Sequence, residues 1–207
     1  RLPDDGGLLE ECTATIIGEV EGLRRLVDEF SRFARMPSFT PRPTDLQRLV
    51  ESVVGLYGET HPTVRLRGDL TGDLPTIEAD GDQLKRALLN LVDNAVEAGA
   101  TEVVIATGWD GGEHVRIVIT DDGPGIPPDL RDRVFLPYFS TKTTGMGLGL
   151  PIVHQIVSDH GGRIRVEDHA PRGTQFSIEL PILRGSAPAV PASALDVAGA
   201  PRDPGPA

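Results

Sequence analysis

The run of residues from Gly81 to Asp121 constrains the fold of this chain more than any other part of the sequence. Gly81 is followed by DQLKRALLNLVDNAVEA, in which apolar residues recur every three or four positions. This spacing predicts a helix over about 81–98. Two runs of alternating apolar residues follow at once, TEVVIATG and HVRIVITD, and the Gly-Gly pair at 111–112 between them predicts a β-hairpin. A helix that leads straight into hairpin-linked strands needs a sheet to pack on.

Shorter signals on either side extend the same mixture of helices and strands. The other predicted elements are a helix through DLQRLVESVVGLYG that Thr44 caps, strands around Val64–Arg67 and Pro75–Ala79, a helix near 148–159, and strands at RIRVE and TQFSIEL. Because most strands are linked as hairpins, this order favours a two-layer α/β sandwich over a doubly wound parallel sheet.

Composition restricts the class of protein. In 207 residues, 39% apolar side chains are enough for a hydrophobic core, and no stretch approaches the roughly 18 apolar residues of a membrane span. The single cysteine, Cys12, excludes an internal disulfide and a multi-cysteine metal site. A net charge of −11 argues against a partner such as nucleic acid, although a local phosphate site is compatible with it.

The two ends of the sequence have contrasting patterns. From Leu9 to Ala34, apolar or small residues are separated by steps of three and four, which predicts one long helix with a narrow apolar seam. Pro37 and the stretch after it end this helix. The seam calls for a partner helix, either in a bundle with another chain or on the following domain. Residues 184–207 are dominated by Pro, Gly and Ala, and we expect a disordered tail there.

Three polar motifs suggest a binding site, and the first lies on the predicted helix over 81–98. Its apolar stripe consists of Leu84, Leu88, Leu91, Ala95 and Ala98. Asn90, Asn94 and Glu97 lie within about 60° of one another on a different stripe. Neutral amide oxygens can ligate Mg²⁺ alongside phosphate oxygens. The alternative is an ordinary solvated helix face.

The second motif is DDGPGI at 121–126, directly after the strand HVRIVITD. A carboxylate at the end of a strand, followed by Gly123 and Gly125, suits a close approach of the backbone to a planar ligand. Asp121 could accept a hydrogen bond from an exocyclic amine such as that of adenine. The alternative is a plain turn, because Asp-Gly and Gly-Pro are common turn dipeptides.

The third motif is TKTTGMGLGLPIV, in which Gly145, Gly147 and Gly149 alternate just before a helix. Free backbone N–H groups at a helix N-terminus, with glycines that allow close approach, form a phosphate cradle, and Lys142 adds a charge nearby. The order of residues is neither that of a P-loop nor that of a dinucleotide-binding fingerprint.

The segment between the two glycine clusters carries the aromatic residues Phe135, Tyr138 and Phe139. A flexible segment between glycine hinges, with aromatic rings that can dock, is typical of a lid over a bound nucleotide. Ordinary anchoring of a surface loop is the alternative.

Four motifs in order, NLVDNAVEA, DDGPGI, FLPYFSTK and GMGLGL, resemble the N box, first glycine box, F box and second glycine box of sensor histidine kinases. With HGG at 160–162 and GTQFSIELP at 173–181, the resemblance covers about Thr44 to Leu183. It implies the Bergerat-type ATP-binding fold of the GHKL superfamily, a two-layer α/β sandwich with a mixed sheet and helices on one face.

The resemblance also implies roles for individual residues. Asn94 would ligate Mg²⁺, Asn90 would lie by the phosphates, Asp121 would bond the adenine amine, and the glycines of the first box would hinge the lid. The full implied ATP site consists of Asn90, Asn94, Asp121, Gly123, Gly125, Tyr138, Lys142, Gly145, Gly147, Leu148 and Gly149. Glu97 stands where the family often has a basic residue, which leaves one phosphate contact unassigned.

The N-terminal segment resembles the second helix of the dimerisation and phosphotransfer hairpin of NtrY-type nitrogen-regulation kinases. The expected organisation is part of that hairpin at 1–37, a linker at 38–43, a catalytic ATP-binding domain at 44–183 and a disordered tail at 184–207. None of the five histidines has the family's phosphoacceptor context. We expect these histidines to be surface or structural residues.

The implied function is Mg·ATP binding for phosphorylation of a histidine, which then supplies an aspartate of an NtrX-like response regulator. This chain alone is not expected to autophosphorylate. A homodimer through the N-terminal helix, a cytoplasmic location and membrane segments upstream in the parent protein are further expectations. The alternatives are an ATP-responsive interaction module and a GHKL ATPase of the DNA-repair or chaperone type.

Overall fold

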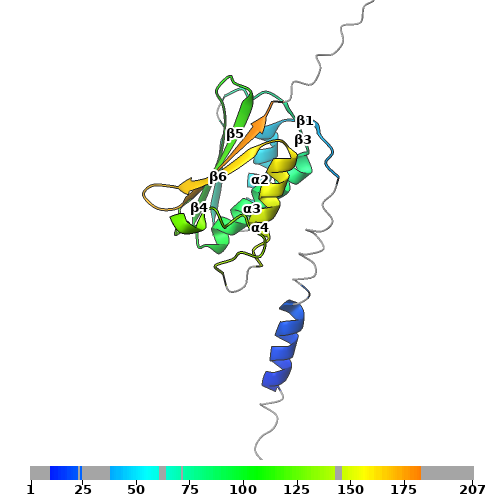
Figure 1. Ribbon diagram of the computed structural model, residues 1–207, viewed down its shortest axis with the longest axis vertical. Helices are drawn as coiled ribbons and strands as arrows, with labels where there is room; N and C mark the ends of the chain where they lie inside the picture. The colour runs from blue at the N-terminus through cyan, green and yellow to red at the C-terminus, as the bar shows by residue number, and fades with distance from the viewer. Residues whose placement is uncertain are drawn as a thin grey trace, which may run out of the picture.

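The structure is a computed structural model that describes residues 10–22, 24, 38–60, 64–70, 72–142 and 146–182. A five-stranded sheet forms one layer, and three helices cover one of its faces (Figure 1). The helices are α2 (Leu46–Thr60), α3 (Gly81–Glu97) and α4 (Gly149–Asp159). The strands of the sheet are β2 (Arg65–Leu70), β4 (Glu102–Trp109), β5 (His114–Asp121), β6 (Arg163–Asp168) and β7 (Thr174–Pro181). The predicted helix over 81–98 and the hairpin after it are confirmed.

The sheet is mixed. Its strand order is β2-β4-β5-β7-β6, in which β2 and β4 are parallel and the other neighbours are antiparallel. The crossover between the parallel pair contains α3, as a parallel connection requires. The expected two-layer α/β sandwich with helices on one face is therefore confirmed.

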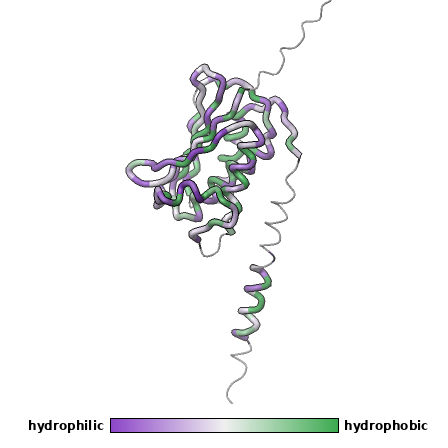
Figure 2. The backbone as a smooth tube through the Cα atoms, viewed as in Figure 1, coloured by the Kyte–Doolittle hydropathy of each residue, from purple (hydrophilic) through white to green (hydrophobic). Residues whose placement is uncertain are grey.

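The hydrophobic core lies between the helices and the sheet. In Figure 2, stretches of hydrophobic residues, in green, occur in both layers. Alternate residues of the central strands are buried, including Ile105 opposite Ile119 and Ile117 opposite Ile178. The predicted apolar stripe of α3 is buried from Leu84 to Ala95, whereas Ala98 is the C-cap and is exposed. Burying each such leucine contributes about 1.5–3 kcal/mol.

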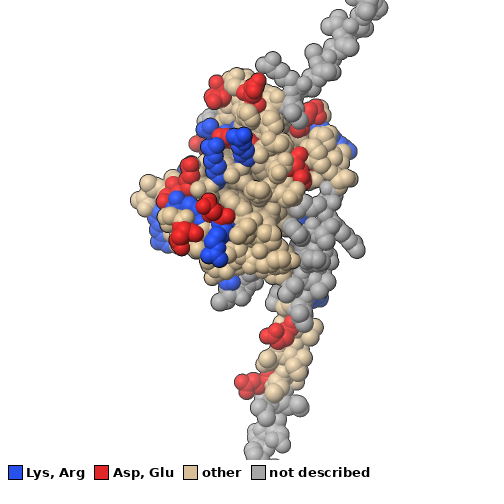
Figure 3. Space-filling model, viewed as in Figure 1, with Lys and Arg blue, Asp and Glu red and all other residues tan. Residues whose placement is uncertain are grey.

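The uncovered face of the sheet carries ion pairs between neighbouring strands. Arg116 of β5 lies opposite Glu179 of β7 at 3.5 Å, and Arg67 of β2 contacts Glu102 of β4 at 2.9 Å. Acidic and basic side chains are interspersed over the face seen in Figure 3. Opposite charges across two strands favour this pairing modestly and keep the solvent-facing side polar.

Two details at the start of the domain differ from the prediction. Arg42–Thr44 forms a short strand, β1, which pairs antiparallel with β3 (Ile77–Ala79), so part of the expected 38–43 linker lies within the folded domain. The cap of α2 is Asp45, whose Oδ1 accepts hydrogen bonds from the backbone N–H groups of Gln47 at 3.0 Å and Arg48 at 3.2 Å. Thr44 was the wrong cap because its hydroxyl donates to the carbonyl of Ala79, at 3.0 Å.

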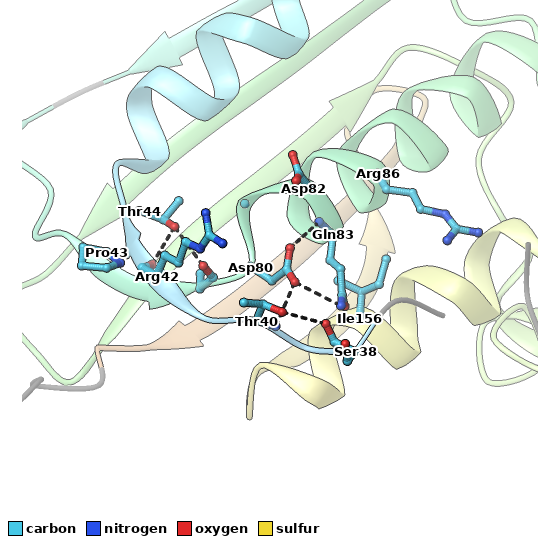
Figure 4. Close-up of a pocket in the computed structure, with 12 residues that line it drawn as sticks. Ser38, Thr40, Arg42, Pro43, Thr44, Asp80, Asp82, Gln83, Arg86 and Ile156 are labelled. Carbon is cyan, nitrogen blue, oxygen red and sulfur yellow. Dashed lines mark hydrogen bonds between the residues drawn. The ribbon is translucent and has the colours of Figure 1, made fainter. Parts of the chain in front are cut away.

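The entry into α3 is fixed by a junction centred on Asp80 (Figure 4). Asp80 caps the helix through the N–H of Gln83 at 3.1 Å and accepts from the N–H of Thr40 at 3.1 Å. Its own N–H donates to His160 Nε2 at 3.0 Å, so the proton of that ring lies on Nδ1, which donates to the Ile156 carbonyl at 2.7 Å. His160 is buried, and the prediction that it is structural is confirmed.

The N-terminal helix is described over residues 10–22 and lies apart from the α/β domain in Figure 1. Its apolar side chains are exposed, with 63% of Ile16, 53% of Ile17 and 58% of Val20 accessible. The rest of the predicted helix, apart from residue 24, and the expected tail at 184–207 lie outside the described residues. Among the helices that the structure describes, none combines the length and apolar character needed to cross a membrane.

Candidate functional site

The predicted site residues come from four segments of the domain. They lie on α3, in the loop after β5, in the segment 127–144 between the glycine clusters (hereafter the lid segment) and in the glycine cluster that leads into α4. The structure describes all of them except Gly145, which falls in the undescribed residues 143–145.

Asp121 is the last residue of β5, and its side chain is largely buried and held in place by two backbone N–H groups. Oδ1 accepts from the N–H groups of Gly123 at 2.9 Å and Thr174 at 3.2 Å. Oδ2 has no hydrogen-bond partner in the described part of the chain. The other oxygen of this largely buried carboxylate is thus free to accept a hydrogen bond from a ligand at this position.

The hairpin between β6 and β7 packs against the loop after Asp121, which sequence reasoning missed. Gly173 has φ +129°, and a Cβ there would lie 1.8 Å from the Asp121 carbonyl oxygen, so only glycine permits this contact. Arg172 Nε donates to the Gly123 carbonyl at 3.0 Å. The Gly-Thr pair that opens GTQFSIELP is the sequence signal for this contact, but the motif by itself predicts only a closing strand.

Lys142 joins the lid segment to α3. Its Nζ lies 2.9 Å from Glu97 Oε2 and donates to Asn94 Oδ1 at 3.1 Å and to the Asn94 carbonyl at 3.3 Å. Asn94 and Lys142, both predicted site residues, therefore lie together, and Glu97, for which the sequence predicted no contact, bonds the same ammonium. These contacts connect residues that are 45 and 48 positions apart in the chain.

Asn90 lies on the same stripe of α3, and its Nδ2 donates to the Gly149 carbonyl at 3.4 Å. A cavity of about 360 Å³ lies beside this contact, lined by residues that include Asn90, Asp93 and Gly149. Of the predicted stripe of polar residues, Asn90 thus faces the start of α4, whereas the Glu97 side chain is exposed.

The N-terminus of α4 is open. Its N-cap, Leu148, makes no side-chain capping hydrogen bond, and the N–H groups of Gly149 and Leu150 have no partner within the helix. A Cβ at Gly149 would meet nothing within 4 Å. Uncapped N–H groups at a helix start, with free space before them, favour an anion such as phosphate.

The lid segment is anchored to the domain by one of its predicted aromatic residues. The ring of Phe135 lies 6.4 Å from that of Phe176 in an edge-on arrangement and 5.7 Å from that of His154. For Phe135 the anchoring alternative is therefore correct. Tyr138 is 63% exposed with φ +63°, and Arg133 stacks on the Phe139 ring at 4.5 Å.

The donor groups fit a nucleotide with a divalent cation. Asp121 offers a free carboxylate oxygen, α4 offers backbone N–H groups, and Asn94 Oδ1 already faces a cation, the ammonium of Lys142. Carboxamide oxygen is a suitable ligand for Mg²⁺, which binds hard oxygen donors. Among the described residues, no group of three or more His, Cys, Asp and Glu forms a separate metal centre.

The fold and this arrangement define a nucleotide-binding domain of the two-layer α/β class. Residues 79–184 match the family described as histidine kinase-, DNA gyrase B- and HSP90-like ATPase, and the chain belongs to this family. The resemblance stated from the four motifs is confirmed.

Similar proteins narrow this assignment. Sensor histidine kinase ZraS of Escherichia coli (strain K12) is 36% identical over 180 residues, which are 86% of this chain and 39% of ZraS. Nitrogen regulation protein NtrY of Azorhizobium caulinodans is 34% identical over 189 residues, 87% of this chain and 24% of NtrY. The chain therefore spans about two fifths, or less, of the length of these relatives.

A solved structure of histidine kinase ThkA in complex with the response regulator protein TrrA is 28% identical, with a TM-score of 0.67. The match covers 86% of this chain and 53% of that one. Together with the relatives, it identifies this chain as the ATP-binding catalytic domain of the sensor histidine kinase type.

Proposed function

We propose that the chain binds Mg·ATP and presents the γ-phosphoryl group to a histidine of its parent protein, from which the phosphoryl group passes to a response-regulator aspartate. The observation that carries this proposal is that α3, which packs against both β5 and α4, carries the amide oxygen of Asn94, while β5 ends in Asp121 with one carboxylate oxygen free and α4 begins with uncapped N–H groups. Phosphoryl transfer depends mainly on positioning and on neutralising charge, which such groups supply.

In this proposal, each segment recognises one part of the nucleotide. Asp121 accepts a hydrogen bond from the adenine amine, Asn94 ligates Mg²⁺, and Asn90 lies by the phosphates. The remaining nucleotide contacts are assigned to Gly123, Gly125, Tyr138, Lys142, Gly145, Gly147, Leu148 and Gly149. The metal ion, when bound, supplies positive charge between the phosphate oxygens, while the protein groups hold the nucleotide in one orientation.

The N-terminal segment belongs, in the same proposal, to the dimerisation hairpin. Exposed Ile16 and Val20 on a regular helix support pairing with another helix, because an apolar stripe in water is unfavourable. The proposed organisation is hairpin helix 1–37, linker 38–43, catalytic domain 44–183 and tail 184–207, in a cytoplasmic part of the parent, with Arg42 and Pro43 at the end of the linker already paired with β3. The ThkA–TrrA complex and the NtrY relative support a response-regulator partner of the NtrX kind.

The site assignment is tested by replacing Asn94 with alanine. Isothermal titration calorimetry should show that Asn94→Ala abolishes Mg²⁺-dependent ATP binding, because the amide oxygen that faces the cation is lost. Gln155→Ala, which removes an exposed amide of α4 that bonds Asp159, should bind as the unaltered chain does. Unchanged affinity in Asn94→Ala would contradict the assignment.

Phosphotransfer is tested with labelled ATP. The chain alone should not become labelled, whereas a hairpin helix of the parent that carries a phosphoacceptor histidine should become labelled when it is added. Strong labelling of the isolated chain would show that one of its own histidines is the acceptor.

A further inference from the structure

Three oxygen atoms converge on the ammonium of Lys142. They are Oε2 of Glu97 at 2.9 Å, Oδ1 of Asn94 at 3.1 Å and the carbonyl oxygen of Asn94 at 3.3 Å. We propose that this is a single cation position with two successive occupants: Lys142 in the nucleotide-free protein and Mg²⁺ in the ATP complex, with Glu97 as its charged ligand. This inference rests on the proposed Mg·ATP function.

The two side chains suit a divalent cation by chemistry and by position. Asn94 and Glu97 are three residues apart on α3, so they lie on the same helix face one turn from each other. Carboxylate and amide oxygens are hard donors, and Mg²⁺ takes such ligands directly or through the water molecules that it keeps. The ammonium of Lys142 marks the place where their oxygens meet.

The contact of Lys142 with Glu97 contributes little to the stability of the fold. The Glu97 side chain is 63% exposed and that of Lys142 is 28% exposed. Ion pairs between groups this accessible contribute about 0–1 kcal/mol, because water screens them. Because the ion pair between Lys142 and Glu97 is this weak, another cation can replace Lys142 beside Glu97. A buried ion pair would be harder to break.

The charge of Glu97 gives the exchange a functional consequence. A carboxylate beside Asn94 repels the triphosphate unless a cation lies between them. Once the oxygens of Asn94 and Glu97 hold the metal ion, Lys142 is released and can contact phosphate oxygens instead. Glu97 thus makes ATP binding depend on the divalent cation. It also lets Lys142 change partners, from α3 in the nucleotide-free protein to the phosphates in the ATP complex.

The variant Glu97→Gln tests the proposal, because it keeps the size of the side chain and removes its charge. ATP affinity should be measured by calorimetry with Mg²⁺ and with EDTA, and the ratio of the two affinities compared with that of the unaltered chain. We expect the affinity for metal-free ATP to rise and the ratio to fall by about tenfold, the effect of one like charge removed near the phosphates. Glu51→Gln, at an exposed position of α2, is the matched control and should leave the ratio unchanged.

The outcomes separate this inference from the proposed function. If the unaltered chain fails to bind ATP with Mg²⁺, the proposed function is wrong. If the unaltered chain binds Mg·ATP and Glu97→Gln retains the same dependence on Mg²⁺, the function stands and the shared cation position is wrong.

A second measurement follows Lys142 directly. The chain has only two lysines, Lys85 and Lys142, so amine labelling followed by peptide mass spectrometry reports each of them separately. Without nucleotide, Glu97→Gln should speed labelling of Lys142 by about threefold, the scale of an exposed ion pair, while Lys85 serves as the internal reference. Equal labelling of Lys142 in both proteins would overturn the proposed contact.

Discussion

Gly147 and Gly149 are two positions apart in the same motif, but they lie in different surroundings. Gly147 has φ +67°, and a Cβ there would lie 2.3 Å from the carbonyl oxygen of Phe139 in the lid segment. Gly149 opens α4 with ordinary helical geometry and free space around it. Packing within the protein therefore requires the first glycine, whereas nothing in the protein requires the second, which we propose leaves room for the phosphates.

Alanine substitutions should distinguish these two positions. Gly147→Ala should lower the free energy of unfolding by about 2–4 kcal/mol, because it combines a backbone clash with an unfavourable φ. Gly149→Ala should change it by less than about 0.5 kcal/mol but weaken ATP binding by about tenfold, because a methyl group enters the phosphate space. Urea denaturation and calorimetry measure the two effects. Equal stabilities of the two variants would contradict the packing argument.

Asp122 makes the domain sensitive to acid. The N–H of Glu102 at 3.0 Å, followed by the hydroxyl of Thr101 at 2.6 Å, lowers the pKa of this carboxyl from 3.8 to about 2. A lowered pKa in the folded state stabilises the fold at pH values above 3.8, and this contribution is lost as the pH falls from about 4 to about 2.

The variant Asp122→Asn should therefore lose part of this acid sensitivity. Unfolding free energies measured between pH 5 and pH 2 by denaturant titration should fall less steeply for Asp122→Asn than for the unaltered chain. Thr101→Val, which removes the second hydrogen-bond donor, should move the acid-sensitive range upward. Identical slopes in all three proteins would contradict the role of Asp122.

At the residue scale, the sequence predicted those site residues that can be recognised from their immediate neighbours in the chain. Asp121 and Gly123 are recognisable because a carboxylate and a glycine directly follow an apolar strand. Thr174, whose N–H bonds Asp121, is 53 positions away, and nothing near it in the sequence states that its backbone supports that carboxylate. The Lys142–Glu97 contact escaped prediction for the same reason, because it depends on where the lid segment returns to α3.

At the scale of elements, His160 connects segments that are far apart in the chain. It bonds both the N-cap of α3 and the last turn of α4, and Phe39 packs edge-on against its ring with centroids 4.8 Å apart. The residues before β1 are thereby tied to two helices that carry the site.

Removing this imidazole should loosen all three segments. His160→Ala should lower the free energy of unfolding by about 2–4 kcal/mol, since it leaves the Asp80 N–H without its acceptor and opens a cavity. Hydrogen exchange at the N–H of Thr40 should become faster, because this group bonds Asp80. His154→Ala, at an exposed position of α4, should cost less than about 1 kcal/mol. A similar loss in the two variants would contradict the proposed junction.

Elements with a strong periodic signal were predicted close to their observed bounds. α3 and the β4–β5 hairpin are examples, because a long apolar stripe and a Gly-Gly turn each specify one structure. β1 was missed because three residues, Arg42–Thr44, carry no periodicity, and only pairing with β3 makes them a strand. Thr44 and Asp45 are both good capping residues, so the choice between them depended on the tertiary contact of Thr44 with Ala79.

At the scale of the molecule, the described N-terminal helix and the α/β domain have separate roles. The core of the domain is formed by residues from Leu46 to Leu180, and the helix over 10–22 contributes no side chain to it. Deleting residues 1–22 should therefore leave the thermal midpoint and the affinity for Mg·ATP unchanged within error. Circular dichroism and calorimetry of the shortened chain measure both, and a lowered midpoint would show that the helix supports the domain.

The sheet is open, and within the described part of the chain its outer strands, β2 and β6, each leave one row of backbone N–H and C=O groups without a neighbouring strand. Unpaired strand edges of this kind are the usual starting points for fibril growth. Both strands carry charges at alternate positions, namely Arg65, Arg67 and Asp69 on β2 and Arg163, Arg165 and Glu167 on β6. A further strand added to either edge would strip these charged side chains of part of their water, and a parallel copy in register would also place like charges opposite one another. The charges on both edges therefore disfavour edge-to-edge polymerisation of the open sheet.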